Sequence, residues 1–352
     1  MGFACRQNGF TIVSMCCLSI YRRATRRRVA AVFSTVLVLV GLAIDAGAAP
    51  PALPGTSAMP TMGGKQFWAD ELFFHQWRIQ RNVLTGHCRL LDEQNYRHES
   101  GTFEQCYEEL ARIRREQRIP PMRGKAVIVL HGLFRSRASM EQLCASLRRN
   151  SDYTVLNVGY PSTRRDVAGH AHALARIIEN LAGIEEINFV AHSMGNIVIR
   201  HYLADQTAMS PDGRVDPRFR RFVMLTPPNQ GSLVATAMPE NRVLESVTGE
   251  AVRQLGQEWD ELEGKLATPS FEFGILAGGR GDESGYNPLL PGDDDGTVSV
   301  AHTRLAGAHD FAVLPLLHSS FVSSEKVMQY TLRFLQKGYF ISATRRHPLN
   351  AE

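Results

Sequence analysis

The sequence has 352 residues, 44% hydrophobic and 21% charged, which is enough to bury the core of one large domain or of two small ones. Its formal charge of +4 arises in residues 1–48, where six arginines face one aspartate (6 − 1 = +5), so that the rest of the chain carries 4 − 5 = −1. Because this body is nearly neutral, nothing in it suggests a basic surface for nucleic acid.

Residues 1–48 have the pattern of an export signal. A cluster of arginines precedes an apolar run, Val29 to Ile44, and the small residues Ala46-Gly47-Ala48 then offer a cleavage site. The run is slightly long for a signal peptide and slightly short for a membrane span, which needs about 20 apolar residues. We expect a cleaved signal peptide, with an uncleaved anchor that meets the membrane through residues 29–44 as the alternative. Either places the body outside the cytoplasm: periplasmic, secreted or membrane-anchored.

Residues 49–64 lack periodicity and are rich in Pro, Ala, Gly and Thr, which indicates a linker. Apolar residues in the next segment recur at steps typical of helices, so we predict that residues 65–118 are mainly helical. We expect residues 65–124 to form a helical N-terminal extension packed on the main domain. The residues behind this prediction are Trp68, Leu72, Phe73, Trp77 and Ile79, followed by Phe103, Cys106, Tyr107, Leu110 and Ile113.

The body contains three cysteines, Cys88, Cys106 and Cys144. In an oxidising compartment one disulfide can form, and Cys88 with Cys106 is the nearer pair in sequence. Three buried thiols are the alternative.

From residue 125 onward strands alternate with helices. Separated in this way, the strands predict parallel βαβ units, hence an α/β domain at 125–340 with a mostly parallel central sheet and helices on both faces. Residues 341–352 form a tail. The predicted strands are 126–130, 154–158, 187–191, 222–226 and 271–277, and the predicted helices are 139–149, 167–181 and 325–336.

Residues 232–268 interrupt this alternation. They follow a turn-rich loop and have the composition of one or two helices. We expect either a helical lid inserted over the site or a plain crossover helix of the core.

The stretch from Ile187 to Arg200 has the strand–turn–helix pattern of a nucleophile elbow. Ser193 follows a short apolar run, and a helical pattern begins at once. Such a turn is sharp and needs small residues two before and two after the serine. Gly195 meets this need, and Ala191 stands where glycine is more usual. Ser193 is therefore the predicted nucleophile.

A serine nucleophile needs a base to take its proton and an acid to orient that base. In this architecture both come after the serine in the chain. Asp295 lies in an Asp-Gly turn and is the predicted acid, with Asp293 and Asp294 as rivals. The alternative for all three is a solvated turn or a calcium loop. The predicted base is His318, which precedes the last helix, and the serious rival is His309.

The sequence His131-Gly132-Leu133 closes the first strand of the domain. This pattern turns the chain back over the sheet and aims a backbone N–H at the elbow. We predict that the amides of Leu133 and Met194 are the oxyanion donors. His131 and His192 are expected to support the shape of their loops. The histidines do not have the spacing of a zinc site.

With these motifs placed, residues 125–340 resemble the α/β-hydrolase superfamily, in particular its bacterial lipase-like and esterase members. The motifs match in order: His131-Gly132-Leu133, Ala191-His192-Ser193-Met194-Gly195, Pro228-Asn229-Gln230-Gly231-Ser232, and Asp295-Gly296-Thr297-Val298 with His318, while Tyr160-Pro161-Ser162-Thr163-Arg164 is also similar. The resemblance implies Ser193 as nucleophile, His318 as base, Asp295 as acid, and Leu133 and Met194 as oxyanion donors. It does not cover residues 1–124.

The sequence thus predicts an exported serine hydrolase that cleaves small-molecule or lipid esters through an acyl-enzyme, with no cofactor and no metal. The alternatives are an acyltransferase with the same triad and a catalytically inactive binding protein of the cell envelope. Product analysis with an added acceptor alcohol separates the hydrolase from the acyltransferase. Failure of a fluorophosphonate to label Ser193 favours the inactive binding protein. The oligomeric state is not predicted.

Overall fold

The computed structural model describes residues 59–60, 65–237 and 249–350. The predicted leader 1–48, with its apolar run 29–44, and most of the linker 49–64 lie outside these residues. Within the described ranges, no helix has both the length and the apolar character needed to cross a bilayer.

The centre of the molecule is a sheet of six strands in the order β11-β10-β9-β8-β6-β7, in which every neighbouring pair is parallel. The chain leaves β6 for β7 on one side and then returns past β6 to β8, so the direction of winding reverses between β6 and β8. Ligands bind beyond the carboxyl ends of strands at such a reversal. The strands are β6 (Gly124–Leu130), β7 (Thr154–Val158), β8 (Ile184–His192), β9 (Phe219–Leu225), β10 (Glu272–Gly278) and β11 (Asp310–Leu314).

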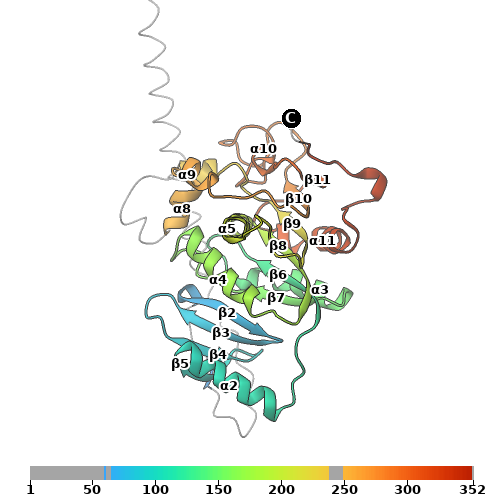
Figure 1. The fold of residues 1–352 in the computed structure, drawn as a ribbon. Coiled ribbons are helices and arrows are strands. Elements are labelled where there is room, and N and C mark those ends of the chain that lie inside the picture. Colours follow the sequence, from blue (N-terminus) through green and yellow to red (C-terminus); the bar gives the residue numbers. More distant parts are fainter. Residues whose placement is uncertain (1–58, 61–64, 238–248, 351–352) are drawn as a thin grey trace, which may run out of the picture.

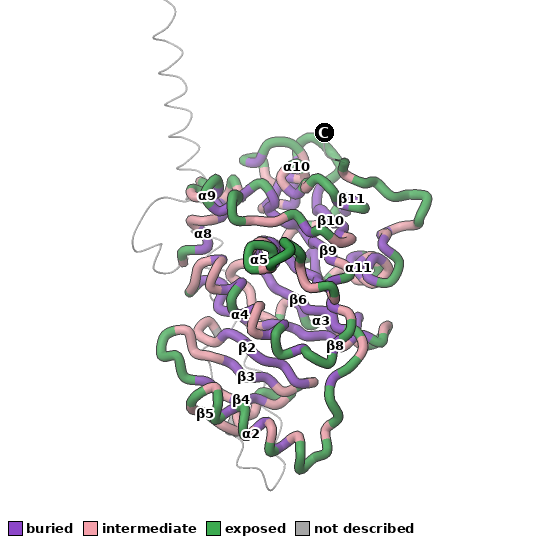
Figure 2. Tube along the Cα trace, viewed as in Figure 1, coloured by how far each residue is buried: buried purple, intermediate pink, exposed green. Residues whose placement is uncertain are grey.

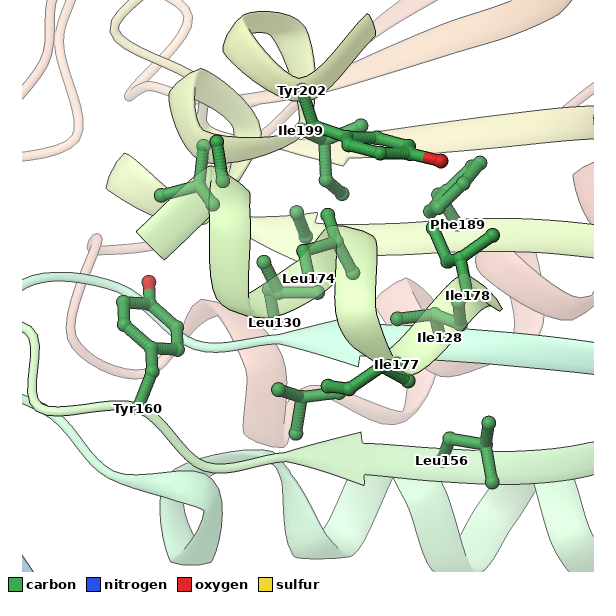
Figure 3. Packing of buried hydrophobic residues seen from close by; sticks show 14 of the residues in the cluster. Ile128, Leu130, Leu156, Tyr160, Leu174, Ile177, Ile178, Phe189, Ile199 and Tyr202 are labelled. Carbon is green, nitrogen blue, oxygen red and sulfur yellow. The ribbon is translucent and has the colours of Figure 1, made fainter. Parts of the chain in front are cut away.

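Helices cover both faces of this sheet, as predicted (Figure 1). On one face α4 (Val167–Glu179) and α5 (Met194–Met209) pack on Ile128 and Leu130. On the other, α3 (Glu141–Asn150) and α11 (Glu325–Lys337) pack on Val127 and Val129. Successive residues of β6 thus point to opposite cores, as a strand buried on both faces requires. The strands of the sheet are accordingly buried and the outer helix surfaces exposed (Figure 2). Figure 3 shows α4 side chains near β6 and β7, and α5 side chains near Phe189 of β8.

The N-terminal extension corrects our prediction, because most of it is an antiparallel sheet. Its strand order is β1-β5-β4-β3-β2. Only α2 (Phe103–Glu116) is helical as predicted, and it begins at a capping box between Thr102 and Gln105. Before β2 comes the short 3₁₀ helix η1 (Lys65–Phe67), and the strands are β1 (Met59–Pro60), β2 (Trp68–Phe74), β3 (Trp77–Asn82), β4 (Cys88–Leu91) and β5 (Tyr96–Gly101).

A β-bulge explains the wrong prediction. The pairing of β2 with β3 shifts between Asp70 and Leu72, which leaves Glu71 as an extra residue. A bulge breaks the two-residue alternation of a strand. Trp68 and Leu72 pair with Asn82 and Ile79 and so lie on opposite faces of the sheet, although their four-residue spacing resembles a helical step.

Strand β2 joins the N-terminal sheet to the central domain. The amide of Asp70 donates to the carbonyl of Gly159, just after β7, over 2.9 Å. Helix α4 also packs on β2, and buried Glu71 accepts hydrogen bonds from Arg81 and from Arg176 of α4. The apolar side chains of this sheet belong to the same core cluster as α4 and α5.

The remaining parts of the chain complete the fold. Residues 232–268 hold α6 (Leu233–Thr236), α8 (Glu250–Leu255) and α9 (Trp259–Glu263) between β9 and β10, and 238–248 lie outside the described residues. The described part of this segment holds three short helices where one or two were predicted, and the lid stays a prediction. Strand β11 was not predicted. The tail holds η4 (Ala343–Arg345), and its last two residues are not described. Short connections elsewhere in the domain are η2 (Arg137–Met140), α10 (Val300–Thr303) and η3 (Phe321–Ser323).

The three cysteines of the body, Cys88, Cys106 and Cys144, are free and buried. This is the alternative of three buried thiols, and burial raises the pKa of the Cys106 and Cys144 thiols to about 12.

The centre of β10 has no room for a side chain. A Cβ added to Gly274 would lie 2.4 Å from the ring of Phe334 in α11, and that ring is fully buried against Phe340. We expect Gly274→Ala to lower the free energy of unfolding by about 1–3 kcal/mol, because the core is overpacked. Urea unfolding measures this change. Gly264→Ala is the control, since a Cβ there meets nothing closer than 3.8 Å, and equal stability of the two variants would contradict this packing.

Candidate active site

Ser193 occupies a strained turn between β8 and α5. Its φ of 54° and ψ of −127° are a conformation that residues with a side chain rarely adopt. Such strain costs about 1–3 kcal/mol and persists only where surrounding contacts enforce it. Here the Ser193 amide donates to the carbonyl of Leu225 over 3.0 Å, and the Ser193 carbonyl accepts the amide of Asn196 over 3.0 Å.

Two glycines let the backbone approach this turn. A Cβ on Gly132 would lie 2.9 Å from Cβ of Ser193, and a Cβ on Gly195 would lie 2.8 Å from the carbonyl oxygen of His131. The loop after β6 therefore lies directly against the elbow. Ala191, where glycine was more usual, is completely buried within the core.

Asp295 and His318 meet beside this elbow. The loop after β10 carries Asp295, and the loop after β11 carries His318. His318 Nδ1 lies 2.6 Å from Asp295 Oδ2, and the His318 amide donates to the Asp295 carbonyl over 2.8 Å. The amides of Thr297 and Val298 donate to Asp295 Oδ1 over 2.9 and 2.7 Å. A carboxylate held at both oxygens fixes the orientation of the imidazole.

The rival aspartates have other partners. Asp293 accepts the backbone amides of Arg280 and Gly281 over 2.6 and 3.0 Å. Asp294 accepts those of Asn287 and Gly296 over 3.0 and 2.6 Å. Both carboxylates shape their own loop, and Asp295 alone of the three bonds to a histidine in the described chain.

The rival His309 lies elsewhere, and so do His302 and His347, the other histidines that follow Asp295 besides His318. The amide of His309 donates to the carbonyl of Phe273 near the start of β10, and that of His347 donates to Asp310 at the start of β11. Both positions are at the amino ends of the strands, the opposite edge of the sheet from Ser193. His302 lies in α10, where its ring bonds to Ser299.

The two histidines that the sequence assigned to loop support are buried at the site. His131 Nδ1 lies 2.9 Å from the carbonyl oxygen of Gly132. The His192 ring centre lies 4.6 Å from that of His318, with the planes tilted by 42°. His192 thus forms part of the surface on which the His318 ring rests.

Ser193 is partly exposed, and so is His318, whose side chain retains 13% of its accessible surface. In the described part of the chain no hydrogen bond joins the Ser193 hydroxyl to the His318 ring; such bonds are often long in unliganded enzymes and tighten with substrate. Met194 is the first residue of α5, so its N–H has no partner in its own helix. The amide of Leu133 donates to no other residue that the structure describes.

Sequence reasoning missed Asn196. Its side-chain amide donates to the carbonyl of Ser193 over 2.8 Å and to that of Leu225 over 3.3 Å, which ties the elbow to β9. Asn196 is fully buried among apolar residues of α5. A polar residue at an apolar helical position, three residues after the serine, is the signal that could have identified it.

No group of three or more His, Cys, Asp or Glu side chains suited to a metal ion occurs among residues 65–237 and 249–350. The calcium loop stays an alternative from sequence alone. The described chemistry of the site is that of a hydroxyl, an imidazole and a carboxylate.

Buried neutral histidines make stability depend on pH. Burial lowers the pKa of His131 to about 4 and that of His170 to about 3. Unfolded histidines bind protons near pH 6.5, so between pH 6.5 and 4 the unfolded chain holds protons that the folded one does not. We expect the free energy of unfolding to fall on acidification by about 1.4 kcal/mol per pH unit for each such histidine.

The variant that checks this is His170→Leu, because neither ring nitrogen of His170 has a hydrogen-bond partner in the described structure. Urea unfolding between pH 7 and 4.5 is expected to show a shallower slope for this variant. His347→Gln, at an exposed position, serves as the control. An unchanged slope in His170→Leu would contradict the burial of a neutral imidazole.

No protein-family model and no curated protein matches this sequence. Solved structures that it resembles include lipases and esterases, several of them bacterial. A Bacillus licheniformis lipase, BlEst2 in propeptide form, is 19% identical with a TM-score of 0.46, over 64% of this chain and 52% of that one. Phospholipase PlaB from Legionella pneumophila in complex with thio-NAD is 18% identical with a TM-score of 0.44, over 60% of this chain and 58% of that one. A metagenomic carboxyl esterase is 18% identical with a TM-score of 0.42, over 60% of this chain and 76% of that one.

The chain spans little more than half the length of the first two of these structures. Its own topology settles the fold. The winding of the parallel sheet reverses between β6 and β8, and the strained serine follows β8. The aspartate and histidine that bond to each other follow β10 and β11. The chain therefore has the α/β-hydrolase fold.

Proposed function

We propose that this protein is an exported serine hydrolase that cleaves carboxylic esters through an acyl-enzyme intermediate. The observation that carries the proposal is the 2.6 Å contact of His318 Nδ1 with Asp295 Oδ2 beside the strained backbone of Ser193. An imidazole oriented by a carboxylate leaves its other nitrogen free to take a proton from a serine hydroxyl.

In the proposed reaction Ser193 Oγ attacks the ester carbonyl carbon while His318 Nε2 takes the hydroxyl proton. The carbonyl oxygen becomes an oxyanion that accepts hydrogen bonds from the amides of Leu133 and Met194. His318 then gives its proton to the leaving alcohol as the C–O bond breaks. Water, deprotonated by His318, attacks the acyl-enzyme. As the bond between Ser193 Oγ and the acyl carbon breaks, His318 returns the proton to Ser193 Oγ and the acid is released. Asp295 stabilises the imidazolium in both halves, and no cofactor is needed.

Apolar side chains near the proposed triad support an apolar ester as the substrate. Leu317 directly precedes His318 and is 44% exposed, and Tyr286 is 38% exposed. A Cβ on Gly296, next to Asp295, would lie 3.5 Å from Leu317 Cδ2 and 4.0 Å from Tyr286 Cβ, so both side chains lie beside the turn that holds the acid. An exposed apolar surface at a site favours an apolar ligand.

Export is supported by the sequence pattern of residues 1–48 alone, with its arginines, apolar run and small-residue site. An N-terminal anchor through residues 29–44 is the alternative form of the same proposal. Detection of mature protein that begins near residue 49 supports cleavage, and retention of the full chain in membranes supports the anchor.

Replacement of the nucleophile tests the reaction. We expect Ser193→Ala to lower the turnover of short p-nitrophenyl esters by at least about 10⁴-fold, because the attacking oxygen is removed. Thermal unfolding of the variant should match or exceed that of the wild type, since alanine still fits the elbow. Activity retained in this variant would refute the assignment.

Replacement of the acid tests the pairing with His318. We expect Asp295→Asn to lower kcat by about 10³–10⁴-fold, because an amide can donate to Nδ1 and so favours the wrong tautomer of the imidazole. The control is Asp293→Asn in the same loop, whose carboxylate accepts only backbone amides. Equal kcat values for the two variants would show that Asp295 is not the orienting acid.

A further inference from the structure

The direction of the Leu133 N–H depends on the carbonyl of Gly132, because the two groups belong to one planar peptide. Gly132 O lies 2.9 Å from His131 Nδ1 and accepts the Arg135 amide over 3.3 Å. A carbonyl can only accept, so His131 Nδ1 carries the proton in this contact. The side chain of His131 thus fixes the peptide plane that presents the proposed oxyanion donor.

Tyr160 holds His131 at two points. Its ring stacks on the His131 ring with centroids 4.2 Å apart and planes 10° apart. Its hydroxyl donates to the backbone carbonyl of His131, which belongs to the peptide that leads into Gly132. Tyr160 is 5% exposed and lies beyond the carboxyl ends of β6 and β7 (Figure 3). Two successive peptides before Leu133 are therefore held by His131 and Tyr160 together.

Tyr160 is in turn anchored by the N-terminal sheet. The Gly159 amide donates to Asp70 Oδ2 over 2.6 Å, and the Asp70 amide donates to the Gly159 carbonyl over 2.9 Å. Asp70 is fully buried, and its other oxygen accepts hydrogen bonds from Arg78 and Gln80 over 3.0 and 2.7 Å. A carboxylate held in this way is a rigid attachment for the residue before Tyr160.

We propose that Tyr160 is a positioning residue for the loop after β6 that carries Leu133, and that Asp70 of the N-terminal sheet holds Tyr160 in place. This inference rests on the proposed ester hydrolysis at Ser193. It gives residues 65–124 a part in the reaction: they fix the loop that carries Leu133 without contact with the substrate. Contacts that orient an oxyanion donor act on the transition state and leave the binding of the ester itself unchanged.

The test compares Tyr160→Phe with Tyr153→Phe. Tyr153 is also buried, and its hydroxyl also donates to a backbone carbonyl, that of Leu335 at the end of α11, over 3.1 Å. Both variants lose one buried hydroxyl–carbonyl bond and keep the aromatic ring, so the urea midpoint should fall in both.

We expect kcat for a p-nitrophenyl ester to fall about 10- to 100-fold in Tyr160→Phe, with KM within about twofold of the wild type, because a small misplacement of a catalytic group costs up to about 100-fold. A trifluoromethyl ketone, which forms a tetrahedral adduct with an oxyanion, should bind more weakly by the same factor. Tyr153→Phe should retain the wild-type kcat and inhibitor affinity.

Asp70→Asn tests the second step of the proposal. We expect it to lower kcat, and we expect the double variant Asp70→Asn/Tyr160→Phe to be no slower than Tyr160→Phe alone, because both changes release the same loop. If the two changes lowered kcat multiplicatively in the double variant, or if Asp70→Asn left kcat unchanged, the N-terminal sheet would not position this loop.

The outcomes separate this inference from the proposed function. An active wild type with an unchanged kcat in Tyr160→Phe, or with a change in KM alone, overturns the positioning role and leaves the hydrolase intact. A wild type that neither hydrolyses esters nor binds the ketone overturns both. Equal losses of kcat in Tyr160→Phe and Tyr153→Phe would show a general effect of stability, and would also overturn the role.

Discussion

The backbone of Ser193 is held at a φ of 54°, and the site depends on this constraint. The turn ends β8 and begins α5, and it leaves the Ser193 side chain partly exposed between the strand and the helix. The strained turn persists because Gly132 and Gly195 let the neighbouring backbone pack within about van der Waals contact of Ser193. In addition, the Asn196 side chain donates hydrogen bonds to the carbonyls of Ser193 and of Leu225 in β9. A side chain at either glycine would press on the elbow or on the loop after β6.

The parallel sheet brings the other groups to this turn. Because all six strands run the same way, the loops after β6, β8, β10 and β11 leave from one edge. Ser193 and His318, which are more than a hundred positions apart in the chain, therefore still lie at the same edge of the sheet. The reversal of winding between β6 and β8 places the loop of His131 and Gly132 directly against the elbow. The antiparallel N-terminal sheet then meets the loop after β7 through Asp70 and Gly159.

Much of this arrangement was predictable from sequence, and the exceptions have physical reasons. Continuous apolar runs predicted five central strands, and the fold class is confirmed. The extension was predicted as helix because the bulge at Glu71 disturbs the alternation of β2. Strand β11, which lies at the edge of the sheet, was not predicted. Sequence order singled out Asp295 and His318, but only coordinates show that Asp293 and His309 face elsewhere. The contact of Tyr160 with His131 leaves no mark in sequence, because it depends on the packing of two separate loops.

The central claim is that Ser193 is a nucleophile activated by the neighbouring His318–Asp295 pair. Peptide mapping by mass spectrometry after reaction with a fluorophosphonate tests it most directly, because the adduct records both the attacking atom and its activation. The account predicts one phosphonyl group on Ser193 in the wild type and a rate of labelling at least about 100-fold lower in His318→Gln. Labelling of another residue, or an equal rate on Ser193 without the imidazole, would contradict it.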